Sequence, residues 1–154
     1  MQNKRNLYIA LGLAGLAVVI LVVGLTYKNW GGEVTPGGDV KVAETKAPQG
    51  EIVKNFPREL MIEASPIIKD SGSLNYESGS QPSVSYYSKF SVTENLRLFR
   101  ARLATLKYEI TNDSKAAEGI YSIYAVRGTE NVNITIVQTD PDVKVNVIMA
   151  YVKM

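Results

Sequence analysis

Residues 91–107 read SVTENLRLFRARLATLK, and this stretch carries the clearest local structural signal in the C-terminal part of the chain. Ser91 and Glu94 form a capping box, in which each side chain bonds a backbone amide at the start of a helix. The apolar residues of the stretch recur at steps of four and three and share one helix face: Val92, Leu96, Phe99, Leu103 and Leu106. The stretch therefore predicts a helix that packs one face on a sheet.

Apolar alternation on both sides of this helix predicts the strands of that sheet. The strand-like segments cover residues 67–76, 84–90, 120–126, 132–137 and 143–151, and a further strand is expected to begin at 108–110, before a loop over 112–119. Short connections at 128–131 and 140–142 favour antiparallel neighbours. The last strand is apolar on both sides from Val147 to Val152, which is typical of a central strand. We predict an α+β domain over residues 56–154, with an antiparallel sheet of about five strands and one helix packed on one face.

An apolar segment at the N-terminus precedes this domain. Residues 7–25 carry no charge, and a helix of that length spans roughly 28 Å, close to the hydrocarbon thickness of a bilayer. We expect a single transmembrane helix over residues 7–27. Its membrane-anchoring side chains are Leu7, Leu11, Leu16, Val19, Leu21 and Leu25, with Trp30 at the interface. A cleaved signal peptide is the alternative, although its apolar region is normally about 7–15 residues long.

The charges beside the apolar segment predict its orientation. Lys4 and Arg5 precede it, so the positive-inside rule places residues 1–6 in the cytoplasm and the C-terminal domain on the extracytoplasmic side of the cell membrane. Residues 28–55 are rich in glycine and proline and lack a sustained apolar period, which predicts a flexible linker. The other interpretation is an ordered partner-binding strand around residues 40–42 or 51–54.

Composition excludes several function classes. Without Lys4, Arg5 and Lys28, the 17 basic residues become 14 against 15 acidic ones, so the part beyond the membrane has a net charge of −1. No basic face for nucleic acid is expected from such a balance. The chain has no cysteine and no histidine. It therefore cannot form disulfides, thiolate nucleophiles, Ser-His-Asp triads or zinc-thiolate sites from its own residues.

Individual candidate sites are sparse. The Asp140-Pro141-Asp142 turn offers too few oxygens for calcium, and we expect neither a metal nor a cofactor. The basic side chains of the helix, Arg97, Arg100, Arg102 and Lys107, are interpreted as a solvated face, with an anionic lipid or acidic partner as the alternative. Tyrosine is frequent on the strands, and Tyr87 and Tyr121 are predicted to form a contact patch on the sheet face that the helix leaves open. Ile123 and Thr135 are assigned to the same outward face.

The sequence also resembles a family of small modules. The resemblance rests on Phe56-Pro57, Leu60 to Ile62, Ala64, Ser71-Gly72-Ser73, the capping box, Leu96, Phe99, Leu103 and Tyr108. In this order they are similar to extracytoplasmic α+β modules of bacterial single-pass membrane-anchored proteins of unassigned function. Those modules typically have Gly-Trp or Gly-Tyr after the helix, where this chain has Lys107-Tyr108. The resemblance implies a fold and brings no catalytic residues with it.

Three functions remain open at this point. The first is a non-enzymatic, membrane-anchored binding or accessory module of a cell-envelope complex, which binds an envelope protein or a second copy of itself. The second is an envelope hydrolase or transferase that uses carboxylates such as Glu77, Glu109 or Glu118. The third is an assembly subunit whose main contacts lie within the membrane, where Ala10 and Ala14 form a small-xxx-small step.

Overall fold

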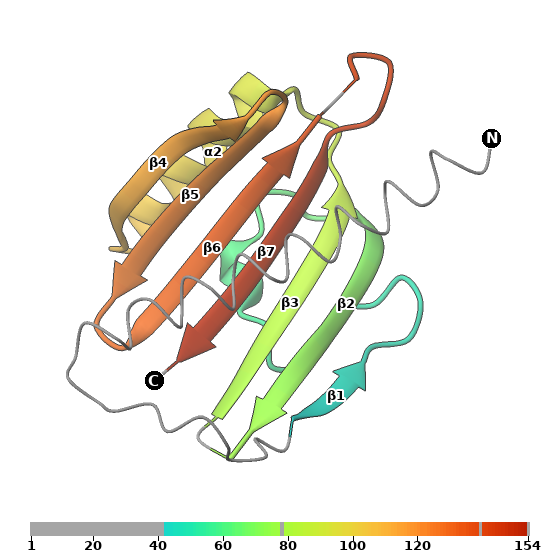
Figure 1. Ribbon diagram of the computed structural model, residues 1–154, viewed down its shortest axis with the longest axis vertical. Helices are drawn as coiled ribbons and strands as arrows, with labels where there is room; N and C mark the ends of the chain where they lie inside the picture. Colours follow the sequence, from blue (N-terminus) through green and yellow to red (C-terminus); the bar gives the residue numbers. More distant parts are fainter. Residues whose placement is uncertain (1–41, 78, 139, 154) are drawn as a thin grey trace. The chain divides into compact units, whose positions relative to one another are not determined.

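One antiparallel sheet of seven strands forms the framework of the computed structural model, which describes residues 42–77, 79–138 and 140–153. The strand order is β1-β2-β3-β7-β6-β5-β4 (Figure 1). The strands are β1 (Ala43–Lys46), β2 (Ile67–Tyr76), β3 (Gly79–Tyr87), β4 (Glu109–Ala117), β5 (Ile120–Arg127), β6 (Glu130–Val137) and β7 (Asn146–Lys153). A short 3-10 helix η1 (Arg58–Leu60) precedes β2, and the α-helix α2 (Val92–Thr105) connects β3 to β4.

The prediction of about five strands is wrong, because the sheet has seven. The two strands that were not predicted are β1, which lies in the predicted linker, and most of β4, which lies in the predicted loop over 112–119. Both are edge strands, and nearly all their residues are exposed. An edge strand with no buried face lacks the apolar alternation by which strands are recognised. The central position of β7, between β3 and β6, agrees with its two-sided apolar sequence.

The predicted transmembrane helix over residues 7–27 and the interfacial Trp30 lie outside the described residues. Within the described residues, no helix has the length and apolar character needed to cross a membrane. The described part of the predicted flexible linker, residues 42–55, is folded. There β1 pairs antiparallel with β2, and Val53 is buried, with its backbone N–H bonded to the Ser71 hydroxyl at 3.0 Å. The flexible-linker prediction is therefore wrong for this stretch.

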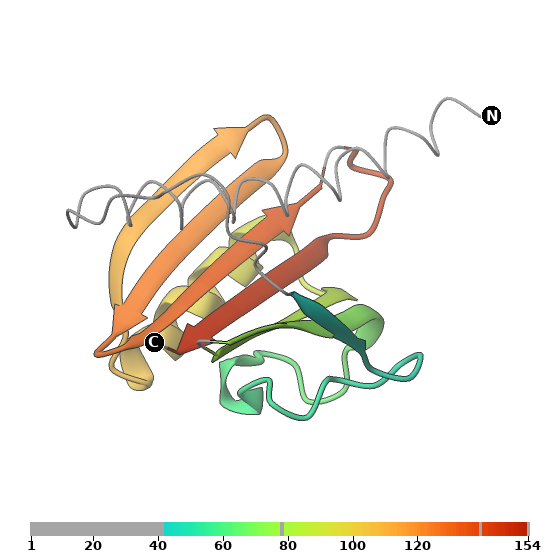
Figure 2. The same ribbon diagram turned by 60° about the horizontal axis from the view of Figure 1, so that its bottom comes forward.

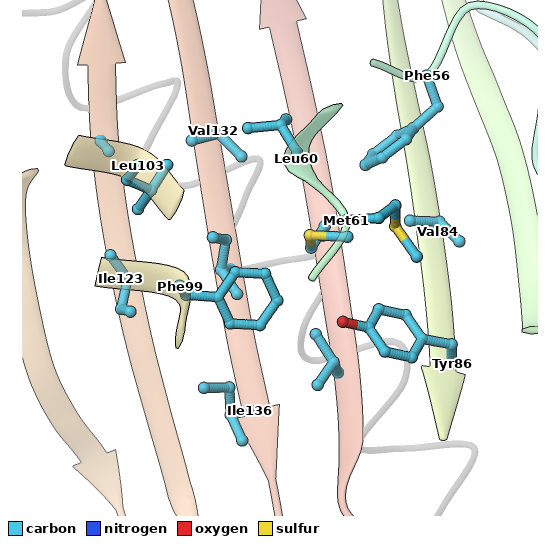
Figure 3. Close-up of a cluster of buried hydrophobic side chains, with 14 of the residues drawn as sticks. Phe56, Leu60, Met61, Val84, Tyr86, Phe99, Leu103, Ile123, Val132 and Ile136 are labelled. Atoms are coloured by element: carbon cyan, nitrogen blue, oxygen red, sulfur yellow. The ribbon is translucent and has the colours of Figure 1, made fainter. Parts of the chain in front are cut away.

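Two elements cover the same face of the sheet (Figure 2). The helix α2 packs on the half formed by β4, β5 and β6, where Phe99 and Leu103 are fully buried. Residues 47–66, which include η1 and which we call the cover segment, pack on the other half. Figure 3 shows the cover-segment side chains of Phe56, Leu60 and Met61 beside the strands. The core therefore needs both covers, whereas the sequence predicted the helix alone.

The ends of α2 follow from its sequence. At its start the capping box is formed as predicted: the Ser91 hydroxyl accepts from the Glu94 amide at 3.3 Å, and the Glu94 carboxylate accepts from the Ser91 amide at 3.0 Å. At its end Lys107 has a φ of 64°, and the N–H groups of Lys107 and Tyr108 bond the carbonyls of Ala104 and Leu103. This is a Schellman motif with lysine at the left-handed position that usually holds glycine.

Replacing Lys107 by glycine is expected to stabilise the domain by about 0.5–1 kcal/mol. A left-handed conformation costs a residue with a Cβ about 1–2 kcal/mol, and glycine removes that cost while adding unfolded-state entropy of about 0.4–1 kcal/mol. Denaturant unfolding of the two proteins measures the difference. The control is Ala101→Gly on the exposed side of the same helix, which should destabilise by about 1 kcal/mol. A Lys107→Gly protein no more stable than the original would contradict the strain argument.

Candidate functional site

The two tyrosines of the predicted contact patch lie on opposite faces of the sheet. Tyr121 is aligned through β6 and β7 with Tyr86, a fully buried core residue. Tyr121 itself packs against the core, whereas Tyr87, the next residue after Tyr86, points to the other side. Ile123, also assigned outward from the sequence, is fully buried. The structure therefore does not form the predicted patch, and only Tyr87 lies on the outward face.

The phase of β5 explains this error. The strand reads Ile120-Tyr121-Ser122-Ile123-Tyr124-Ala125-Val126, so each of its two faces carries apolar or aromatic residues. Alternation alone does not distinguish the faces of such a strand, and a change of phase by one residue exchanges them completely. Pairing with β6 places Tyr124 on the outward face in place of Tyr121.

The outward face of the four central strands carries no charged residue. We call it the open face, because α2 and η1 both lie on the other side of the sheet (Figure 2). This absence of charge contrasts with the whole chain, in which 21% of the residues are charged. All the outward positions of these strands are half-buried. From β3, β7, β6 and β5 in turn they are Gln81, Ser83, Ser85, Tyr87; Asn146, Ile148, Ala150, Val152; Asn131, Asn133, Thr135, Val137; and Ile120, Ser122, Tyr124, Val126.

Two pairs of polar side chains on the open face are bonded across strands, whereas the buried side-chain oxygen of Asn146 has no hydrogen-bond partner among the described residues. The Tyr124 hydroxyl lies 3.0 Å from the Asn131 carbonyl oxygen and donates to it, and the Ser122 hydroxyl donates to that of Asn133 at 3.3 Å. The side-chain amide nitrogens of Asn131 and Asn133 form no hydrogen bond with another described residue. The face thus combines oriented donors with the aliphatic side chains of Ile148 and Val152, a composition suited to contact with another surface.

A pocket of about 520 Å³ lies at one end of the sheet, where β3 ends, β2 and β7 begin and the chain enters α2. Its apolar lining includes Ile67, Tyr87, Phe90 and Val143, and the buried carboxyl group of Glu63 also lines it. Ser88, a second lining residue, bonds Glu63. Sequence reasoning missed Glu63, because it carries no motif and contacts residues distant in the sequence.

Arg127, Glu130 and Tyr108 form a charged cluster near the C-terminal end of α2, where their side chains interact with one another. The Arg127 guanidinium donates to the Glu130 carboxylate at 2.5 and 2.8 Å, and it lies 4.4 Å from the centroid of the Tyr108 ring. The Tyr108 hydroxyl donates to the same carboxylate at 2.9 Å. Burial and this bond raise the pKa of Tyr108; for Glu130, burial acts upward, but the bonds from Arg127 and Tyr108 prevail and lower the pKa. Each charge is thus compensated within the cluster.

The carboxylates of the enzyme alternative are not brought together. Glu77 lies at the β2–β3 turn and Glu118 at the β4–β5 turn, while Glu109 begins the edge strand β4, and all three are exposed. Asp140 accepts a bond from the Asp142 amide at 3.0 Å, which makes a local turn of the Asp-Pro-Asp sequence. Across the described ranges, no group of three or more acidic, histidine or cysteine side chains is placed to hold a metal ion.

Comparison with known proteins adds no family to this description. No protein family, curated protein or solved structure matches the chain.

Proposed function

We propose that this chain is a membrane-anchored, extracytoplasmic binding module of a cell-envelope complex that acts without catalysis. The apolar residues 7–27 hold it in the lipid bilayer, and the domain beyond them binds a protein partner through the open face. The observation that carries the proposal is the absence of charge from the outward positions of β3, β7, β6 and β5.

The composition of the open face supports a docking role. A sheet face that only meets water is commonly polar and includes charged side chains, since these keep the protein soluble. The centres of protein interfaces are instead depleted of charge and enriched in tyrosine. Tyr87 and Tyr124 lie on the open face among serine, asparagine and aliphatic side chains. This mixture matches the centre of an interface more closely than an indifferent surface.

The same composition defines the partner. A charged partner surface would lose its hydration against the middle of the open face, which costs several kcal/mol per ion. Opposite charge is present only beside the β2 edge of that face, where Lys69 lies over the Tyr87 ring and Asp70 is aligned with Ser85. We therefore propose a partner protein with an uncharged surface that mixes aliphatic and hydrogen-bonding groups. A second copy of this chain satisfies that description through the same face, and its capture is one outcome of the experiment.

Placing a lysine at Thr135, in the middle of the open face, is expected to reduce partner capture by about tenfold or more, because an unpaired charge in the contact costs about 2–5 kcal/mol. Thr135 is half-buried, and its neighbours across the strands are Ser122 and Ile148. The measurement is the yield of the crosslinked product after crosslinking in intact cells and purification of the tagged chain.

The matched control is Thr105→Lys on the exposed side of α2, which should give the same product as the original chain. A product of twice the chain mass would identify the partner as a second copy. Equal yields from Thr135→Lys and Thr105→Lys, with both proteins folded, would contradict the proposal.

A further inference from the structure

Glu63, in the pocket at the end of the sheet, is a buried carboxyl group that has no cationic partner within residues 42–77, 79–138 and 140–153. Glu63 is only 7% exposed and lies in the cover segment, just before β2 begins. Among the described residues the ion pairs are Lys46–Glu44, Arg100–Asp113 and Arg127–Glu130, and Glu63 belongs to none of them. Burial of a carboxylate is costly unless hydrogen bonds or an opposite charge compensate it.

Only one oxygen of the Glu63 carboxylate accepts a hydrogen bond from another described residue. The Ser88 hydroxyl oxygen lies 2.5 Å from the Glu63 Oε1 and 3.1 Å from the Asn95 Oδ1, yet a hydroxyl has a single hydrogen to donate. The orientation of Asn95 is fixed, because its Nδ2 donates to the carbonyls of Phe90 and Ser91 at 3.0 Å each. The Ser88 hydroxyl accepts from the Phe90 amide at 3.1 Å and gives its hydrogen to the nearer acceptor, the Glu63 Oε1. No described residue donates a hydrogen bond to the other carboxylate oxygen, Oε2.

Nearby groups do not supply a donor to this oxygen. The Tyr86 hydroxyl is buried without a hydrogen-bond partner, so it does not reach the Glu63 carboxylate. Lys89 lies over the Phe90 ring, with its ammonium nitrogen 5.1 Å from the ring centroid, and Lys144 is exposed. The pocket lining thus combines a buried carboxylate with two exposed lysines, and neither lysine forms an ion pair with Glu63.

The walls of the pocket favour an aliphatic ligand. Ile67 is 61% exposed and Val143 is 41% exposed, and both line the pocket together with Tyr87 and Phe90. Apolar side chains that line one pocket together with a few polar groups are typical of a ligand site. An aliphatic stem between these walls would place its polar end near Glu63.

We propose that this pocket binds a primary ammonium group on an aliphatic stem, such as the side chain of a lysine. The ammonium donates to the Glu63 Oε2, to which no described residue donates, and its stem covers Ile67 and Val143. A compact ammonium fits better than a guanidinium, because Ser88 already occupies the Glu63 Oε1 and the carboxylate does not offer both oxygens freely to a planar fork. The site shares Tyr87 with the open face, but its binding can be tested without a partner.

The test is a titration of the full-length chain in detergent micelles with Nα-acetyl-lysine methylamide, followed by the methyl NMR signals of Ile67 and Val143. The matched ligand, Nα-acetyl-norleucine methylamide, has the same apolar stem without the ammonium. We expect the lysine compound to shift both signals with an affinity about tenfold or more above that of the norleucine compound. Equal affinities for the two compounds would overturn the proposal.

Two variants assign the binding to named residues. Glu63→Gln keeps the side-chain shape and removes the charge, so it should weaken lysine-compound binding by about tenfold or more. Unchanged binding would show that the carboxylate does not hold the ammonium, and it would overturn the proposal. If Glu63→Gln does not fold, Ile67→Ser serves instead, because that side chain is exposed; it should weaken binding about fivefold, read from the Val143 signal. No change in that variant would equally overturn the proposal.

Discussion

A Phe99→Ala protein is expected to lose about 3–5 kcal/mol of unfolding free energy. Phe99 is fully buried in the middle of α2, and its ring lies against the core side chains of β5 and β6 (Figure 3). The substitution removes the apolar contacts of the ring and leaves a cavity. The sheet fills this cavity poorly, because hydrogen bonds to the neighbouring strands hold each central strand in place. For a domain of ordinary stability, about 5–15 kcal/mol, this is a large fraction of the total.

Urea unfolding followed by circular dichroism measures the loss. Arg97→Ala is the control, since Arg97 is exposed on the same helix and its replacement should change the stability by about 0.5 kcal/mol or less. A Phe99→Ala protein as stable as the Arg97→Ala protein would show that α2 does not pack on the sheet as described.

Removing residues 42–55 is expected to destabilise the domain by about 3 kcal/mol or more. A fragment that begins at Phe56, the boundary predicted from the sequence, loses buried Val53 and the bond from its N–H to Ser71. It also loses the four residues of β1 that pair with β2. Burial of a valine contributes about 1.5–3 kcal/mol and each hydrogen bond about 0.5–1.5 kcal/mol.

The matched fragment for this comparison begins at Val42. It should unfold in one cooperative transition, whereas the shorter fragment exposes the ten-residue strand β2 as a new sheet edge and is expected to aggregate. Equal stability and solubility of the two fragments would contradict the inclusion of residues 42–55 in the fold.

The sequence predicts α2 well because the signals for a helix are local. The capping box fixes its start at Ser91, and the apolar steps fix the face on which Phe99 and Leu103 lie. Modules that resemble this chain have glycine after the helix, so the geometry of the turn at Lys107 was not predicted. In the structure Lys107 adopts a left-handed backbone conformation. Elements whose structure depends on neighbours in space were not predicted. The strands β1 and β4 are exposed edges without apolar alternation, and the cover segment has no regular repeat of apolar residues.

The residues of the candidate site likewise could be predicted only where the local sequence pattern is unambiguous. Tyr87 was assigned to the correct face because β3 alternates serine with buried residues, whereas β5 has no such contrast and Tyr121 was assigned out of phase. The uncharged open face emerges only when four strands are placed side by side. Glu63, Ser88 and Asn95 come from the cover segment, the end of β3 and α2, so no local motif joins them.

The most direct test of the open face as a docking surface is site-specific photo-crosslinking in intact cells. A benzoylphenylalanine at position 124 replaces a half-buried tyrosine of the open face, and the same residue at position 97 replaces an exposed arginine of α2. We expect a crosslinked partner from position 124 and none from position 97. A partner crosslinked from position 97 and not from position 124 would contradict the proposal that the open face is the docking surface.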